Sequence, residues 1–241
     1  MRTKIIAHRG ASFITGEDNS LKSFARAISI KADYVEFDIR RTLDNKLIVF
    51  HDNEVGGVEI SKLNYRELND IIYEEKGFKV PLLVEVLKLC KGKIKLDIEL
   101  KEGGYEKRVI KMVTSMYGYE EFMMKSFIDN VVARIKIIDP NITTGLLVGC
   151  KNGDIKRRLN EYFPERRLRA CKCDFVASYY RFTTVMFIAR MRFFGYKIYV
   201  WTVNNKRNIR KFIKRGVAGV ITDKPDLVTS GKFIIERKKQ K

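Results

Sequence analysis

Nine short apolar runs along the chain constrain its fold more than any other feature. They lie at residues 4–8, 34–39, 47–51, 94–100, 123–127, 143–148, 174–178, 197–203 and 219–222. Each run is typical of a buried strand, and longer segments of helical period separate most of them. Strands that alternate with helices predict repeated β-α units and a parallel sheet.

The second and third runs lie too close together for that pattern, because parallel strands need about a dozen connecting residues. We expect them to form an antiparallel hairpin with Asp44-Asn45 as a two-residue turn, which would set Asp38 opposite His51. Eight parallel strands then remain. A chain of 241 residues therefore predicts one α/β domain, a TIM-type (β/α)₈ barrel with an extra β-hairpin arm after the second strand.

Three of the connecting segments carry clear helix signals. Residues 20–30 place apolar side chains on one face, after a possible cap at Asn19 or Ser20. Residues 81–89 open with Pro81 at the expected first turn. Residues 205–215 end at Gly216, a common helix stop.

The composition and the lack of linkers indicate a single folded unit. Hydrophobic residues make up 45% of the chain, and no linker or repeat divides it. We expect residues 1–231 to form the barrel and residues 232–241 to be a basic tail. No apolar run is long enough for a signal peptide or a membrane span. Four cysteines without paired spacing favour free thiols in a reducing cytoplasm: Cys90, Cys150, Cys171 and Cys173.

Charge is strongly uneven between the two halves of the chain. Residues 1–120 contain 21 Lys/Arg and 19 Asp/Glu, whereas residues 121–241 contain 27 and 10. This asymmetry indicates an anionic partner for the second half, such as a phosphate substrate, a membrane surface or nucleic acid. A lysine-rich surface that only keeps the protein soluble explains the charge equally well.

The only two histidines both fall at the ends of predicted strands, His8 in His8-Arg9-Gly10 and His51 in His51-Asp52. A barrel carries its functional groups at the carboxyl ends of its strands. Although a single histidine is more often structural, two at such positions favour acid-base chemistry, for which a pKa near neutrality is useful.

Carboxylates gather on two strands that would be neighbours in the barrel. Glu36 and Asp38 share one face of the first, and Asp97 and Glu99 share one face of the second together with Lys101. Acids buried side by side repel one another and need a cation between them. Oxygen ligands suit Mg²⁺ or Ca²⁺, whereas two histidines without a thiolate cluster disfavour a tetrahedral zinc site.

Two interpretations of these acids remain open. One is a salt-bridge network with Arg9, Lys101 and Arg40. The other is a divalent cation that polarises a phosphoryl oxygen while Arg9 and Lys101 neutralise the remaining phosphate charge. In that case one histidine would remove a proton from the attacking group and the other would protonate the leaving alkoxide. This is the chemistry of phosphodiester cleavage.

Ordered motifs over nearly the whole chain resemble the glycerophosphodiester phosphodiesterase family. They are His8-Arg9-Gly10-Ala11-Ser12, Glu36-x-Asp38, His51-Asp52, Pro81-x-Leu83-x-Glu85, Glu99-Leu100-Lys101, Ser126-Phe127, Trp201-Thr202-Val203-Asn204 and Gly219 to Pro225 with Asp223 between them. The order and spacing of these motifs, rather than any one of them, carry the resemblance.

The resemblance implies a role for each matching residue. It implies one divalent cation, Mg²⁺ or Ca²⁺, held by Glu36, Asp38 and Glu99. It implies His8 and His51 as the acid-base pair, Arg9 and Lys101 on the substrate phosphate, and Trp201 at the glycerol end of the pocket. From the sequence pattern alone, Trp201 is equally well explained as a buried core residue. The implied reaction is hydrolysis of glycerophosphodiesters to sn-glycerol 3-phosphate and an alcohol, a step of lipid and glycerol metabolism.

Two departures from the family pattern concern the surroundings of the site. Glu17-Asp18-Asn19-Ser20 stands where the family usually has Pro-Glu-Asn-Thr, so that Asp18 is a shorter acid. After Asp52 the chain lacks the usual Arg-Thr-Thr stretch and longer insertion. We expect catalysis to survive these changes and substrate choice to respond to them.

The basic half leaves two further functions open. Residues 181–197 mix aromatic residues with cations and are best interpreted as an ordinary outer helix. A bolder hypothesis is that the basic half rests on an anionic membrane and that the enzyme takes lysophospholipids, as a lysophospholipase D does. A non-catalytic barrel that binds through its basic face is the remaining alternative. No motif for nucleic-acid binding is present, and we expect a cytoplasmic protein that can be peripheral at the membrane.

Overall fold

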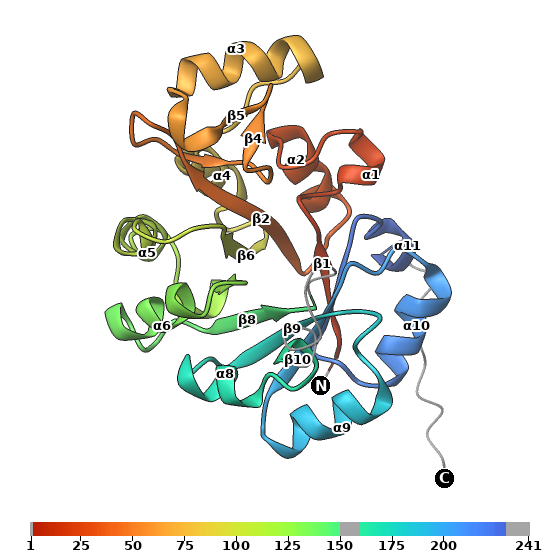
Figure 1. Ribbon diagram of the computed structural model, residues 1–241. Helices are drawn as coiled ribbons and strands as arrows, with labels where there is room; N and C mark the ends of the chain where they lie inside the picture. The colour runs from red at the N-terminus through yellow and green to blue at the C-terminus, as the bar shows by residue number, and fades with distance from the viewer. Residues whose placement is uncertain (1, 150–159, 230–241) are drawn as a thin grey trace.

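The computed structural model describes residues 2–149 and 160–229 and contains the predicted barrel (Figure 1). Eight parallel strands follow one another around it, and the pairing of β1 with β2 closes the ring. These strands are β1 (Lys4–Ala7), β2 (Tyr34–Arg41), β6 (Lys95–Leu100), β7 (Phe122–Ser126), β8 (Thr144–Val148), β9 (Phe175–Tyr179), β10 (Lys197–Trp201) and β11 (Gly219–Thr222). The predicted fold class is therefore confirmed, and the predicted tail, residues 232–241, lies outside the described residues.

The ninth strand, β3 (Leu47–Val49), returns antiparallel to β2 on the outside of the barrel. The expected hairpin is present, but its predicted register is wrong by one residue. Ile39 pairs with Val49, and the amide of Phe50 donates to the carbonyl of Asp38 at 3.0 Å. The cause is that the loop has three residues, 43–45, instead of two. The amide of Thr42 donates to the carbonyl of Lys46, and Asn45 adopts a left-handed φ of 59°.

Helices surround the barrel and connect its strands (Figure 1). They are α1 (Ser12–Thr15), α2 (Leu21–Ser29), α3 (Tyr65–Lys76), α4 (Leu83–Cys90), α5 (Glu106–Thr114), α6 (Asp129–Ile138), α8 (Glu165–Ala170), α9 (Val185–Phe193), α10 (Lys206–Lys214) and α11 (Asp226–Thr229), with the 3₁₀ turns η1 (Ile60–Lys62) and η2 (Tyr119–Glu121). Each of the three predicted helices is found within two residues of its expected start.

Local hydrogen bonds set the exact starts of these helices. Ser20 and Ser23 cap α2 reciprocally, and Asn205 caps α10. Helix α4 begins two residues later than predicted, because the carbonyl of Pro81 accepts the amide of Val49 at 2.9 Å. Residues 81–82 are thereby held in extended form against β3.

An additional small unit lies between β3 and α4. It contains β4 (Glu54–Val55), β5 (Val58–Glu59), η1 and α3, and Figure 1 shows it at the upper end of the molecule. Its apolar residues form a cluster of their own with the outer side of β3. The segment that follows His51-Asp52 is thus a packed structure. None of the helices in the described ranges is long and apolar enough to cross a membrane.

Candidate active site

A left-handed turn at the end of β1 presents the first histidine. Arg9 and Gly10 have φ values of 51° and 84°, and the carbonyl of Arg9 accepts hydrogen bonds from the amide of Asn19 and the hydroxyl of Ser23 at 3.0 Å each. A Cβ on Gly10 would lie 2.3 Å from the Ser23 hydroxyl oxygen. Glycine is required here because the turn is left-handed and α2 packs directly against it. Together these contacts fix where His8 and Arg9 point.

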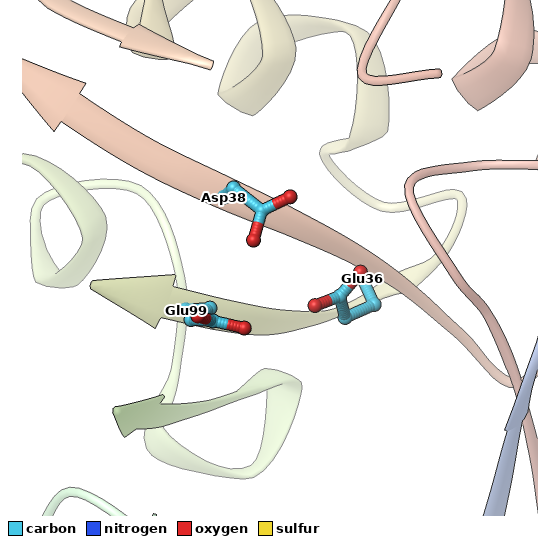
Figure 2. A group of neighbouring side chains, drawn as sticks. All are labelled: Glu36, Asp38 and Glu99. Carbon is cyan, nitrogen blue, oxygen red and sulfur yellow. The ribbon is translucent and has the colours of Figure 1, made fainter. Parts of the chain in front are cut away.

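Three carboxylates meet on the neighbouring strands β2 and β6. The register sets Glu36 beside Asp97 and Asp38 beside Glu99. One oxygen from each of Glu36, Asp38 and Glu99 lies within 4.8 Å of the others, and all three residues are buried. Figure 2 shows the three side chains converging on the space between the two strands. The structure thus brings together the three acids that the sequence suggested as metal ligands.

The donor set of this triad fits a hard divalent cation. All three groups offer oxygen, the ligand that Mg²⁺ and Ca²⁺ prefer. Burial, together with the neighbouring Asp38 and Glu36, raises the pKa of Glu99 to about 7, although Lys101 opposes the shift. Burial disfavours the charged form of Glu99, and the neighbouring carboxylates add to this effect. A bound divalent cation would stabilise that charged form.

Of the cations that the sequence suggested, Arg9 and Lys101 border the triad. The Lys101 ammonium lies 2.7 Å from Glu99 Oε1 and 3.2 Å from Asp38 Oδ1. The Arg9 guanidinium lies 3.5 Å from Asp38 Oδ2, and the Arg9 amide donates to Glu36 at 2.9 Å. Burial disfavours the charge on Asp38, but Lys101 and Arg9 hold its pKa well below the usual range. These ion pairs form part of the salt-bridge network that the sequence left open as an alternative to a metal site. The pKa of Glu99 nevertheless remains raised.

His8 is oriented by an acid from the last strand of the barrel. Its Nδ1 lies 2.6 Å from Asp223 Oδ1, and its Nε2 lies 3.9 Å from Glu36 Oε2. Asp223 is held in turn by Asn204, whose side chain accepts the Asp223 amide at 2.9 Å. Burial lowers the pKa of His8, but Glu36 and Asp223 outweigh it, so that the net shift is upward. The Nε2 edge is directed toward the carboxylate triad.

His51 reaches the same pocket from the hairpin. Its Nδ1 lies 2.8 Å from Asp52 Oδ1, and its carbonyl accepts from Arg40 Nε at 2.9 Å. Arg40 itself pairs with Glu102 at 2.9 Å, away from the triad. Burial lowers the pKa of His51, and Asp38 compensates only in part. His51 reaches the site although the predicted strand register was wrong, because β3 ends at Val49, two residues before it.

The eight residues to which the family resemblance gave a role line one pocket at the carboxyl ends of the strands. These residues are His8, Arg9, Glu36, Asp38, His51, Glu99, Lys101 and Trp201. Trp201 donates its indole N–H to the carbonyl of Ala177 at 2.9 Å and packs edge-on against Phe127, with 5.5 Å between ring centroids. It is only partly buried, so it forms a wall of the pocket rather than part of the sealed core.

Lys125 is a site residue that sequence reasoning missed. It is 1% exposed, and its ammonium lies 2.6 Å from Asp97 Oδ2 and 3.3 Å from Glu36 Oε1. Burial raises the pKa of Asp97 to about 6, against the effect of Lys125. The signal was a lysine in the mostly apolar strand β7. Side chains alternate along a strand, so Lys125 faces the same side as Met123, toward the barrel interior.

Three polar residues from loops were also not assigned a role. Asp223 and Asn204 orient His8, as described above, and Asn19 donates to Asp38 Oδ2 at 2.8 Å. Asp18, the shorter acid of the sequence departure, accepts from Arg9 Nη1 at 3.0 Å. Each of these side chains lies in a sequence motif described for the family resemblance, but only the fold shows which residue it contacts.

Known proteins resemble this chain along almost its full length. A protein-family model described as the glycerophosphoryl diester phosphodiesterase family matches residues 8–227. A glycerophosphodiester phosphodiesterase from Caldanaerobacter subterraneus subsp. tengcongensis is 29% identical over 243 aligned positions, which cover 94% of this chain and 96% of that protein.

Solved structures agree with this likeness. A glycerophosphodiester phosphodiesterase from Parabacteroides distasonis has a TM-score of 0.76 at 28% identity, covering 93% of this chain and 94% of that one. A phosphodiesterase from Oleispira antarctica, solved in complex with the product sn-glycerol-3-phosphate, has a TM-score of 0.79 at 22% identity and covers 95% of this chain and 96% of that one. At that identity the second likeness concerns the fold.

Proposed function

This chain belongs to the glycerophosphoryl diester phosphodiesterase family and is a phosphoric diester hydrolase, and we propose that it hydrolyses glycerophosphodiesters to sn-glycerol 3-phosphate and the free alcohol. The convergence of both histidines on one buried carboxylate triad carries the proposal. The product named for the Oleispira antarctica structure is consistent with it.

Glu36, Asp38 and Glu99 would hold one divalent cation, Mg²⁺ or Ca²⁺. When bound, the cation polarises a phosphoryl oxygen and offsets the charge that develops there. The pairing of Glu36 with Lys125 and of Glu99 with Lys101 fixes the positions of these carboxylates before the cation arrives. Such preorganisation is what a metal site needs from the residues around it.

The cationic residues of the pocket would bind the substrate phosphate. Arg9 and Lys101 stand on either side of Asp38, at 3.5 and 3.2 Å from its two oxygens. A phosphate that enters between them would exchange these carboxylate contacts for charge-assisted hydrogen bonds to its own oxygens. Trp201 and Phe127 would line the glycerol end of the pocket.

The two histidines would transfer the protons. Each imidazole has its Nδ1 against an aspartate, Asp223 for His8 and Asp52 for His51. This pairing leaves Nε2 as the edge that meets the substrate. One Nε2 would accept the proton of the attacking oxygen, and the other would donate a proton to the leaving alkoxide. The products are the same whichever histidine takes each part.

A polar hollow beside the pocket would receive the leaving alcohol. It shares Lys101 with the pocket, and its lining includes the polar residues Arg40, Asn53, Ser61 and Glu102 beside the apolar Leu43 and Ile60. Hydroxyl, amide and charged groups of this kind suit a hydrophilic headgroup. This hollow therefore supports a water-soluble diester as the substrate.

Product identity tests the proposed reaction. The purified protein is incubated with glycerophosphocholine or glycerophosphoethanolamine and divalent cation, and glycerol 3-phosphate, free alcohol and phosphorylated alcohol are quantified separately. We expect glycerol 3-phosphate and free alcohol in equal amounts. Phosphocholine or phosphoethanolamine as product would mean that the other ester bond is broken, and would refute the assignment.

Hydrolysis of lysophospholipids is the second candidate, favoured by exposed apolar side chains on α1, the helix that follows the His8 turn. Phe13 and Ile14 in α1, a few residues after His8, are 65% and 37% exposed. An acyl chain could lie against them while the phosphate occupies the same site. The same product assay with lysophosphatidylcholine distinguishes the two. A higher kcat/KM for the lysolipid than for glycerophosphocholine would make it the principal substrate.

A further inference from the structure

One region of the chain contains no acidic residue. Residues 175–222 include ten Lys and Arg but no Asp or Glu. This stretch forms β9, α9, β10, α10 and β11, a contiguous sector of the barrel. Apart from Lys197, the exposed first residue of β10, the cations of this sector lie on its two helices and loops.

Helix α10 turns its charges away from the barrel. Ile209 and Phe212 are its buried residues, at 1% and 3% exposure. Its exposed residues include five cations: Lys206, Arg207, Arg210, Lys211 and Lys214. A helix with one apolar side and one wholly cationic side is typical of binding to an anionic surface.

Helix α9 exposes mainly apolar residues on its outer side, with Arg192 as its exposed cation. Phe187, Ile188 and Met191 pack toward the barrel, whereas Val185, Met186 and Phe193 face outward at 61%, 78% and 85% exposure. An outer barrel helix normally presents polar residues to water. Large apolar side chains exposed together mark a site of interaction.

The two helices form one surface, here called the α9–α10 surface. The Arg192 side chain donates to the carbonyl of Gly216 at 2.9 Å, and the Arg215 side chain donates to the carbonyl of Thr183 at 3.5 Å. These bonds join the ends of α9 and α10, and Figure 1 shows the two helices next to each other on the lower right flank of the barrel. An apolar strip and a cationic strip therefore lie side by side.

We propose that the α9–α10 surface docks this enzyme on an anionic lipid bilayer. The apolar side chains of α9 would enter the boundary between headgroups and acyl chains, and the cations of α10 would contact the lipid phosphates. A second copy of the chain is a poor occupant, because a symmetric interface would bring two cationic helices together. The phosphates of a nucleic acid would pair with the cations of α10, but the apolar side of α9 would remain exposed to water.

Docking in this way is compatible with turnover. The surface lies on the outside of the helical ring, whereas the pocket opens at the carboxyl ends of the strands. Contact with a bilayer therefore need not cover His8, His51 or the carboxylate triad. The inference is independent of which diester the pocket accepts.

Vesicle co-sedimentation tests the proposal with the full-length protein. We expect binding to vesicles that contain phosphatidylglycerol, little binding to pure phosphatidylcholine vesicles, and weaker binding at high salt. The variant Arg207→Gln/Lys211→Gln/Lys214→Gln should bind at least about tenfold less tightly. Met186→Ser/Phe193→Ser should also bind less tightly, and that loss should persist at high salt because it removes apolar contacts.

Matched changes on other helices provide the controls. Ile137 in α6 is 81% exposed, and Lys88, Lys107 and Lys111 are exposed on α4 and α5. Ile137→Ser and Lys88→Gln/Lys107→Gln/Lys111→Gln should bind vesicles as the wild type does. All four variants should hydrolyse a soluble diester at the wild-type rate, which shows that they are folded.

Three results would overturn the proposal. The first is no binding to phosphatidylglycerol vesicles at low salt. The second is equal loss of binding in the control variants, which would mean that net charge alone acts. The third is unchanged vesicle binding in the α9 variant together with loss of self-association in sedimentation velocity, which would make the surface an interface between copies.

Discussion

The two sides of the barrel interior differ sharply in polarity. Strands β2, β6 and β7 contribute the buried charges Glu36, Asp38, Asp97, Glu99 and Lys125. The opposite wall, β8 to β11, contributes Leu147, Phe175, Tyr199 and Ile221. We call these the charged wall and the apolar wall. Most charges of the charged wall pair with one another, although Glu99 keeps a raised pKa. The apolar wall contributes mainly packing, and its Leu147 and Ile221 also line the pocket.

The apolar wall is tightly fitted as well as apolar. A Cβ on Gly145 would lie 2.0 Å from the Phe175 ring, and one on Gly219 would lie 2.5 Å from the Tyr199 ring. The aromatic rings thus occupy the space that side chains at these positions would need. The comparison indicates that charged-wall substitutions should affect activity, and also stability where they leave a buried charge unpaired, whereas apolar-wall substitutions should mainly affect stability.

Removing either histidine should produce the largest effect. His8→Ala and His51→Ala should each lower kcat by about 10²- to 10⁴-fold, because each removes a proton-transfer group. Their unfolding midpoints should stay close to that of the wild type. The apolar-wall variant Phe175→Leu should do the reverse, with near-normal kcat and a loss of roughly 1–3 kcal/mol in the free energy of unfolding. Near-normal turnover in a histidine variant would remove that residue from the mechanism.

Lys125 provides a stability test within the charged wall. Lys125→Met leaves Asp97 and Glu36 without their buried cation and should lower the free energy of unfolding by about 3–5 kcal/mol. Urea denaturation measures the loss. The double variant Lys125→Met/Asp97→Asn should recover part of it, since one uncompensated charge is also removed. No recovery would show that Lys125 contributes by packing rather than by charge.

The ligand assignment can be tested by metal binding without substrate. Glu36→Gln and Glu99→Gln should each weaken Mn²⁺ binding, measured by calorimetry, by at least about 10- to 100-fold. A loss of that size is typical when a residue that only supports a metal ligand is removed, so the loss of a ligand itself should not be smaller. Glu102→Gln is the matched control, because this acid pairs with Arg40 at 2.9 Å outside the triad. An unchanged Mn²⁺ titration in both triad variants would contradict the assignment.

The pH dependence of metal binding should be the smallest of these effects. Burial raises the pKa of Glu99 to about 7, so below that pH a cation must displace a proton from this carboxyl. Affinity should therefore fall as pH decreases, by up to about tenfold per unit below pH 7. Glu99→Gln should flatten the profile. A wild-type affinity that does not change between pH 5 and 7 would be inconsistent with a protonated Glu99.

The sequence predicted the barrel well because its strands and helices carry strong local signals. It predicted eight residues of the pocket because the ordered motifs that resemble the family contain all of them. It failed at the hairpin register, since nothing local shows that Asn45 adopts a left-handed conformation. It also missed the contacts of Lys125 with Asp97 and Glu36, which join three different strands and exist only once the barrel has closed.

Chelation followed by metal add-back tests most directly whether the charged wall performs metal-dependent hydrolysis. Release of glycerol 3-phosphate from glycerophosphocholine is measured in the untreated protein, after EDTA, and after addition of Mg²⁺ or Ca²⁺. We predict that EDTA abolishes turnover, that at least one of the two cations restores it, and that Glu36→Gln responds poorly to either. Full turnover in the presence of EDTA would contradict a cation at Glu36, Asp38 and Glu99.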